Sequence, residues 1–160
     1  MKPLLVILMG SKSDLAHAKR IEEAAIPFGF EVVMRVASAH KTAAHALELL
    51  QQYESDPRPK VYVTIAGRSN ALSGFTDGTV TAPVIACPPP SEAFAGVDLY
   101  SSLRMPSGIA PAVVLEPVNA ALLAAKIIGV SDPEMRKTII AYQIQMQNTI
   151  LADDQEIQGF

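Results

Sequence analysis

The chain has 160 residues, of which 49% are hydrophobic and 18% are charged, a balance typical of one globular domain with a real core. A formal net charge of -3 provides no basic surface, so nucleic acid is a disfavoured partner. One cysteine excludes an intrachain disulfide, and no apolar run approaches the roughly 18 residues of a membrane-spanning helix. Lys2 is followed by a strand-length apolar run and then a polar loop, unlike a signal peptide. We expect a soluble cytoplasmic protein with no membrane partner.

The first element is predicted to be a buried strand. Residues 4–9 (LLVILM) form a short apolar run, typical of a strand buried on both faces in a parallel sheet. Gly10 permits a sharp turn, and Ser11, Ser13 and Asp14 follow where a helix begins. Unpaired N–H groups and the helix dipole favour an anion such as phosphate there. An equally good interpretation of this stretch alone is that Ser13 or Asp14 only caps the helix.

A second strand over 31–36 leads into the loop Ser38-Ala39-His40-Lys41, and Thr42 is predicted to cap a helix over 43–53. Imidazole is the side chain best suited to move protons near neutral pH, which makes His40 a candidate for proton transfer. Lys41 offers a cation to a phosphate or a carboxylate. The alternative interpretation is a loop histidine that caps the next helix.

A third strand over 60–66 runs into Gly67-Arg68-Ser69-Asn70. Backbone N–H groups together with a guanidinium suit an oxyanion or a carboxylate. Alternatively, this loop is a helix start whose Arg68 pairs with a surface acid.

Strands that alternate with helices predict parallel strands joined by right-handed crossovers, and therefore a three-layer α/β/α sandwich of flavodoxin-like shape. In such sheets ligands bind at the carboxyl ends of the strands, where all three polar loops lie. We expect one domain over residues 1–160. The remaining predicted elements are a helix over 17–25, strands over 82–87 and 111–115, a loop with a short helix over 91–104, and a helix from 117 to 128.

A long helix over about 132–152 is predicted to follow a sheet that is already complete. It is apolar over much of its circumference, so we expect it to pack on a neighbouring subunit of a homo-oligomer.

The remaining candidate residues have ordinary structural interpretations. His17 and His45 fall within predicted helices, and three histidines on separate elements do not make a zinc site, so no metal is expected. Cys87 has no histidine or cation beside it in sequence and is predicted to pack at a strand end. Neither a dinucleotide fingerprint nor a nucleoside-triphosphate loop motif is present. A more ambiguous polar cluster consists of Ser102, Arg104 and Ser107.

Five short segments, taken together and in order, resemble the aminoimidazole ribonucleotide carboxylase family of purine biosynthesis over essentially the whole chain. Each segment alone is weak, but five in order are specific. They are residues 9–14 (MGSKSD), 38–41 (SAHK), 66–70 (AGRSN), 87–89 (CPP) and 101–108 (SSLRMPSG).

The family has two branches. In the mutase branch, which moves a carboxylate from carboxyaminoimidazole ribonucleotide, the third loop reads AGGAAHL and the second reads SAHRT. Here Ala71 stands in place of the mutase histidine, and Lys41 in place of the arginine. Both departures resemble the branch that uses carbon dioxide directly, which is fused to a synthetase in animals and free-standing in some prokaryotes.

The resemblance implies reversible carboxylation of 5-aminoimidazole ribonucleotide by CO2 at carbon 4, without ATP, biotin or metal, in a homo-octamer. The mutase reaction and a non-catalytic nucleotide-binding module remain the alternatives. By the resemblance, Ser11, Ser38 and Lys41 hold the 5′-phosphate, Asp14 binds the ribose hydroxyls, and Ser13 is a further substrate-binding residue. His40 moves the proton at carbon 4, and Gly67, Arg68 and Ser69 line the CO2 and carboxylate end.

Overall fold

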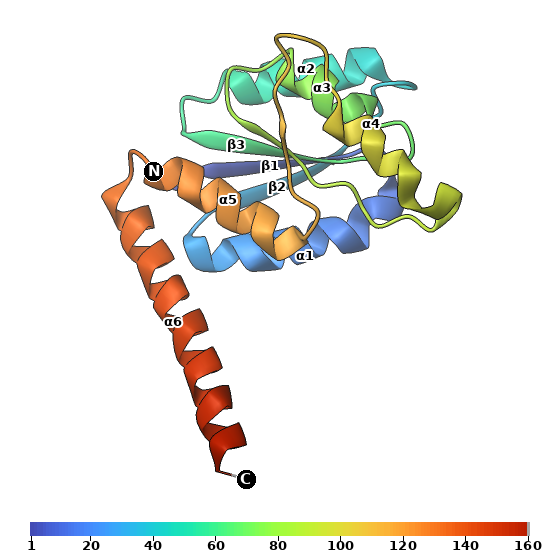
Figure 1. Cartoon of the computed structure of the whole chain (residues 1–160). Helices are drawn as coiled ribbons and strands as arrows, with labels where there is room; N and C mark the ends of the chain where they lie inside the picture. The colour runs from blue at the N-terminus through green and yellow to red at the C-terminus, as the bar shows by residue number, and fades with distance from the viewer. Residues whose placement is uncertain (160) are drawn as a thin grey trace.

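The computed structural model describes residues 1–159, in which five parallel strands form one sheet in the order β2-β1-β3-β4-β5 (Figure 1). This order matches the flavodoxin-like arrangement that the alternating pattern predicts. The strands are β1 (Leu4–Met9), β2 (Glu31–Val36), β3 (Lys60–Ile65), β4 (Val84–Ala86) and β5 (Ala112–Val113).

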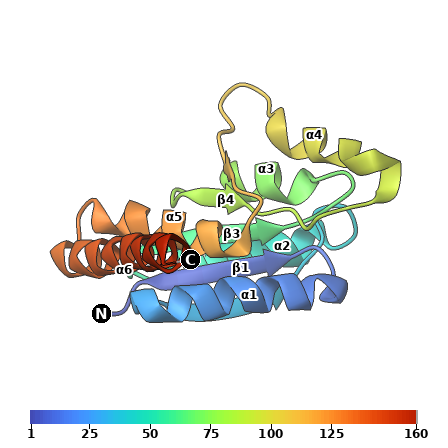
Figure 2. The same cartoon turned by 60° about the horizontal axis from the view of Figure 1, so that its bottom comes forward.

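Helices cover both faces of the sheet and complete the predicted three-layer sandwich (Figures 1 and 2). The apolar run of β1 explains why both faces must be covered, because its six side chains are all buried. Leu5, Ile7 and Met9 join the core under α1 (Leu15–Ala25) and α5 (Pro117–Gly129). Alternate residues of β1 join the core on the other face, under α2 (Ala43–Glu54) and α3 (Ala71–Asp77): these are Leu4, Val6 and Leu8.

Short helical segments fill the connections. The 3-10 helices are η1 (Lys12–Asp14), η2 (Ile26–Phe28) and η3 (Ala93–Leu99), and η3 continues into α4 (Tyr100–Leu103). This last pair confirms the loop and short helix predicted over 91–104. Within η3, Phe94 and Ala95 have φ angles of 51° and 52°, so the segment bends sharply.

The final helix, α6 (Pro133–Gln158), starts against the body and then projects away from it (Figure 1). Asp132 caps it by accepting hydrogen bonds from the N–H groups of Glu134 and Met135 at 2.9 and 3.1 Å. Only its base packs on the domain, where the Tyr142 ring lies 5.4 Å from the Phe28 ring. The helix exists as predicted but runs six residues beyond the expected end at 152. No helix within residues 1–159 is both long and apolar enough to cross a membrane.

The loop after β3 opens into the helix α3, for which the sequence predicted no bounds. Asn70 starts this helix by accepting a hydrogen bond from Ser73 N at 3.1 Å, and Leu72 and Thr76 are buried beneath it. Tertiary burial therefore stabilises a seven-residue helix with a glycine near its middle. The strands predicted over 82–87 and 111–115 are present but shorter.

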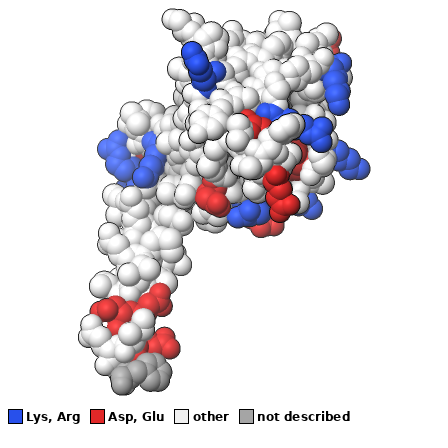
Figure 3. Space-filling model, turned by 45° about the vertical axis from the view of Figure 1, so that its right-hand side comes forward, with Lys and Arg blue, Asp and Glu red and all other residues white. Residues whose placement is uncertain are grey.

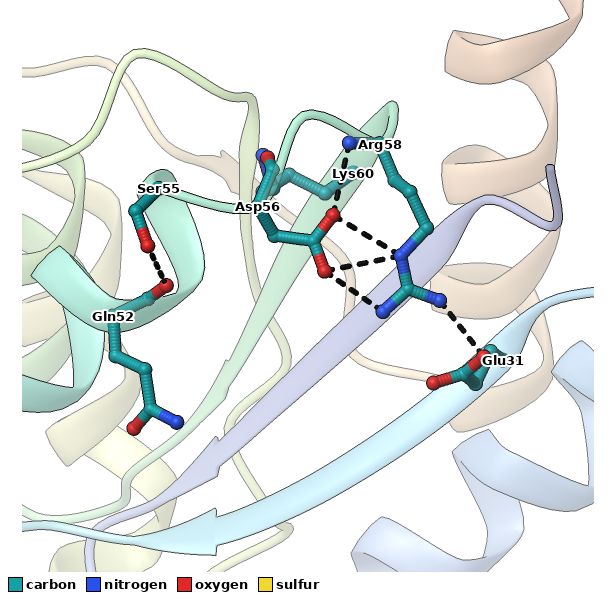
Figure 4. Close-up of polar contacts among 6 residues, drawn as sticks. All are labelled: Glu31, Gln52, Ser55, Asp56, Arg58 and Lys60. Carbon is teal, nitrogen blue, oxygen red and sulfur yellow. Dashed lines mark hydrogen bonds and ion pairs between the residues drawn. The ribbon is translucent and has the colours of Figure 1, made fainter.

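At the amino end of the sheet, Arg58 joins two strands through carboxylates (Figure 4). Its Nε and Nη2 donate to the Asp56 carboxylate at 2.8–3.1 Å, and its Nη1 donates to Glu31 Oε2 at 2.7 Å. Lys60 Nζ donates to the main-chain oxygen of Asp56 at 2.7 Å. These hydrogen bonds from Arg58 lower the pKa of Asp56 to about 2.

We predict that Arg58→Met lowers the thermal unfolding midpoint at pH 7 by a few degrees, because bidentate pairing is lost. The folded-state pKa of Asp56 lies below its ordinary 3.8, so the ion pair stabilises the fold above about pH 4. That stabilisation disappears as the pH falls toward 2, and 1 M NaCl should weaken it. The control is Lys137→Met, which removes an exposed pair with Glu134. Equal midpoint shifts for the two variants would contradict this account.

Candidate active site

Four loops meet at the carboxyl ends of the strands and enclose a cleft of about 570 Å³. The chain leaves β1 toward β2 on one side and reaches β3 on the other, so this is the point where the strand order reverses. Every site residue predicted from the sequence lines this cleft. The lining includes Ser11, Ser13, Asp14, Ser38, His40, Lys41, Gly67, Arg68 and Ser69.

The loop after β1 is a helix cap that also faces the cleft. Ser11 Oγ accepts from Ser13 N at 3.3 Å, and Asp14 Oδ2 accepts from Ser11 N at 3.2 Å, which together form a capping box. Burial raises the pKa of the Asp14 carboxyl above its ordinary value. Ser11 is thus the N-cap and Asp14 completes the capping box, so the capping interpretation holds in part for Asp14 and is wrong for Ser13. Capping and lining the cleft are not exclusive here.

The loop after β2 presents an exposed His40 to the cleft. Ser38 folds the loop by accepting from Lys41 N at 3.3 Å. Thr42 does not cap α2 through its side chain, contrary to the prediction. Its Oγ1 instead accepts from Ser38 N at 2.9 Å, which tightens the turn that carries His40.

The loop after β3 is held in an uncommon conformation. Arg68 has a φ angle of 59°, in the left-handed region that side chains with a Cβ rarely adopt. Its N–H donates to Asp98 Oδ2 at 2.9 Å, and its main-chain oxygen accepts from Ser101 Oγ at 2.8 Å. The alternative interpretation, in which Arg68 pairs with a surface acid, is wrong for its side chain, because the guanidinium forms no ion pair within residues 1–159. Only its backbone N–H contacts an acid, Asp98. The N–H groups of Gly67 and Ser69 have no hydrogen-bond partner within residues 1–159.

A buried polar network lies beneath this loop. Asn70 Nδ2 donates to Ser102 Oγ at 2.9 Å, and Asn70 Oδ1 accepts from Ser73 Oγ at 2.9 Å. Ser73 Oγ in turn lies 2.7 Å from Thr64 Oγ1 on β3. Because buried and fully paired polar groups are rigid, the network fixes the loop to the sheet.

Sequence reasoning missed part of the cleft wall. Asp98 lines the cleft and accepts a hydrogen bond from the backbone N–H of Arg68, which lies 30 residues earlier in the sequence. Pro89, Pro90 and Ser91 also line it; the motif over 87–89 gave the only signal for this segment. Of the ambiguous polar cluster, Ser102 belongs to the buried network, while Arg104 and Ser107 are not among the cleft residues.

A smaller cavity of about 310 Å³ adjoins the cleft and contains His17 and Arg20 in its lining. His17 Nε2 lies 3.4 Å from Cys87 Sγ, so a histidine is near the thiol in space although none is near in sequence. Burial raises the pKa of the Cys87 thiol to about 12 and lowers the pKa of His17. Cys87 is thus a buried, protonated thiol at a strand end, as predicted.

A sequence model of the family described as AIR carboxylase, where AIR is aminoimidazole ribonucleotide, matches residues 4–149. The chain belongs to the AIR carboxylase family. Membership makes it an enzyme of purine biosynthesis, in agreement with the five motifs. Within residues 1–159 of this family member, no three His, Cys, Asp or Glu side chains gather closely enough to hold a metal ion.

Similar proteins cover nearly the whole of this carboxylase family member. A Treponema denticola protein named phosphoribosylaminoimidazole carboxylase is 55% identical over 157 residues, which are 98% of this chain and 99% of that protein. The crystal structure of Treponema denticola PurE has a TM-score of 0.95 and covers 97% of this chain and 98% of that one, at 55% identity. A human bifunctional phosphoribosylaminoimidazole carboxylase/phosphoribosylaminoimidazole succinocarboxamide synthetase is 44% identical over 128 residues, which are 80% of this chain and 30% of the human protein.

Proposed function

We propose that this enzyme carboxylates 5-aminoimidazole ribonucleotide directly with CO2, reversibly and without ATP, biotin or metal, to give 4-carboxy-5-aminoimidazole ribonucleotide. The observation that carries the proposal is the composition of the cleft. His40 is the one imidazole among its described lining residues, because Ala71, which follows the lining loop 66–69 and is not itself in the lining, stands where the mutase branch has a histidine. Lys41 in place of the mutase arginine supports the same branch.

The chemistry needs little beyond position and one base. The aminoimidazole ring is an enamine, so its carbon 4 attacks the carbon of CO2, a C–C bond forms, and one C=O electron pair moves to oxygen. The proton on carbon 4 must then leave, and His40 is the group that accepts it. In the reverse direction His40 returns this proton to carbon 4 as CO2 departs.

The proposed binding roles follow the loops. The hydroxyls of Ser11, Ser13 and Ser38 and the Lys41 ammonium bind the 5′-phosphate, near the helix start after β1. The Asp14 carboxylate accepts from the ribose hydroxyls. The N–H groups of Gly67 and Ser69, with the Arg68 guanidinium, favour the negative charge that develops on the new carboxylate.

We also propose that the enzyme is a cytoplasmic homo-oligomer, with the octamer as the expected assembly. The support is α6, whose middle part, residues 138–152, contains no Asp, Glu, Lys or Arg and therefore separates the charged residues at the two ends of the helix (Figure 3). Exposed apolar side chains in this middle part of α6 include Ile140, Ile144, Met146, Ile150 and Leu151.

The test uses the decarboxylation direction. Purified protein is incubated with 4-carboxy-5-aminoimidazole ribonucleotide, loss of its ultraviolet absorbance is followed, and any carbamate product is trapped. We expect release of CO2 and free aminoimidazole ribonucleotide without carbamate. Carbamate as the first product would favour the mutase, and nucleotide binding without turnover would favour a non-catalytic module.

A further inference from the structure

Residues 98–101 form hydrogen bonds with both the N–H and the main-chain oxygen of Arg68, which lines the cleft. Asp98 accepts the N–H of Arg68 at 2.9 Å, and the Ser101 hydroxyl, whose single proton has two acceptors, lies 2.8 Å from the main-chain oxygens of both Arg68 and Asp98. The same Ser101 Oγ accepts from Asn70 N at 3.0 Å. Hydrogen bonds from one segment therefore fix the backbone on both sides of the Arg68 side chain.

These hydrogen bonds act on the residue whose backbone is strained, Arg68. A φ angle of 59° is unfavourable for arginine, and a residue keeps such a conformation only where its surroundings enforce it. The neighbouring Asn70 is anchored to β3 through Ser73 and Thr64, but this network does not reach the N–H of Arg68. Asp98 supplies that contact.

The conformation of Arg68 also decides what the loop offers to the cleft. With its own N–H bound to Asp98, Arg68 contributes its guanidinium, and the N–H groups of Gly67 and Ser69 stay without partners among residues 1–159. A change of φ at Arg68 would rotate the peptide groups on both sides of it. The N–H groups of Gly67 and Ser69 would then no longer point in their present directions.

We propose that Asp98 is a positioning residue: its carboxylate holds Arg68 in the left-handed conformation, so that the 67–69 loop presents its donors to the carboxylate formed at carbon 4. Ser101 assists from the other side of the same residue. This inference rests on the proposed function. It assigns Asp98 no proton transfer and no contact with the nucleotide.

The kinetic test compares Asp98→Ala, Asp98→Asn and Ser101→Ala in the decarboxylation assay. Asp98→Ala should lower kcat by roughly 10- to 100-fold, since small misplacements of catalytic groups have effects of this size. The KM for the nucleotide should change less than about threefold, because other loops bind the phosphate and ribose. Asp98→Asn keeps an oxygen acceptor of the same shape and should restore most of the kcat. Ser101→Ala should lower kcat with the same unchanged KM.

Asp77 provides a matched control. Its Oδ2 accepts a hydrogen bond from the N–H of Ala110, 33 residues later in the sequence, at 2.7 Å. Like Asp98, it is a carboxylate bound to a distant backbone N–H, but it does not line the cleft. Asp77→Ala should keep kcat within about twofold of the wild type, even if its thermal midpoint falls. A kcat of Asp98→Ala or Ser101→Ala equal to that of the wild type would overturn the proposal. So would an Asp98→Asn variant as slow as Asp98→Ala.

A crystal structure of Asp98→Ala separates this proposal from the proposed function. We expect the φ angle of Arg68 to leave the left-handed region. An inactive wild type would refute the proposed function, and the structure would still decide on Asp98: an unchanged Arg68 backbone in the variant would refute its positioning role.

Discussion

His40→Asn is expected to lower kcat for decarboxylation by about 10²- to 10⁴-fold, the usual contribution of a positioned acid or base. His40 is exposed and lines the cleft, on a turn fixed by Ser38 and Thr42. Asn has a similar shape and polarity but cannot take the carbon-4 proton. The dissociation constant of the nucleotide should therefore change by less than about threefold, which calorimetric titration would measure beside the rate.

The matched control for this variant is His45→Asn. His45 is an exposed histidine on α2, 3.9 Å from Glu48, and it does not line the cleft. Its replacement should leave kcat within about twofold of the wild type. If His40→Asn retained more than a tenth of the wild-type kcat, His40 would not be the base.

Ile144→Glu in α6 is expected to break the assembly. Ile140, Ile144 and Leu151 recur at spacings of four and seven, so they lie on one face of the helix, and each is at least half exposed in the single chain. In an oligomer this face becomes an interface, where an unpaired carboxylate costs several kcal/mol. Since about 1.4 kcal/mol is a factor of ten, association should weaken by at least ~100-fold.

Analytical ultracentrifugation at micromolar concentration would detect this dissociation as a fall in mass. The control is Gln145→Glu, which adds the same charge one residue further along the helix. By helical spacing Gln145 lies away from the face of Ile140 and Ile144, so the variant should keep the wild-type mass. The same mass for the Ile144→Glu variant and the wild type would show that this face of α6 is not an interface.

Those parts of the fold that depend on local pattern were predictable. The six apolar residues of β1 require cover on both faces, and repeated strand, polar loop and helix segments lead to a parallel sheet. Elements that depend on tertiary contacts were not. The bounds of the helix α3 could not be predicted, because seven residues with Gly74 inside carry no long periodic signal. The strand β5 was predicted over 111–115, but its actual length of two residues is set by its pairing with β4.

The site divides in the same way. The candidate residues after β1, β2 and β3 could be predicted to lie together, because parallel strands bring their carboxyl ends to one edge, and they do line one cleft. Asp98 was not predicted, because its contact with Arg68 spans 30 residues. Every residue except proline has a backbone N–H, so the sequence does not indicate which one a distant carboxylate accepts from. The positive φ angle of Arg68 was equally unpredictable, since no glycine stands at that position to indicate it.

The source of the new carboxylate tests the central proposal most directly. The enzyme is given carboxyaminoimidazole ribonucleotide with a 13C-labelled carbamate, in buffer with a large pool of unlabelled CO2, and the isotope in the carbon-4 carboxylate is measured by mass spectrometry at early times. Direct carboxylation predicts that the product carries the unlabelled carbon of the dissolved pool. A product that keeps the 13C of the carbamate would contradict the account and assign the enzyme to the mutase branch.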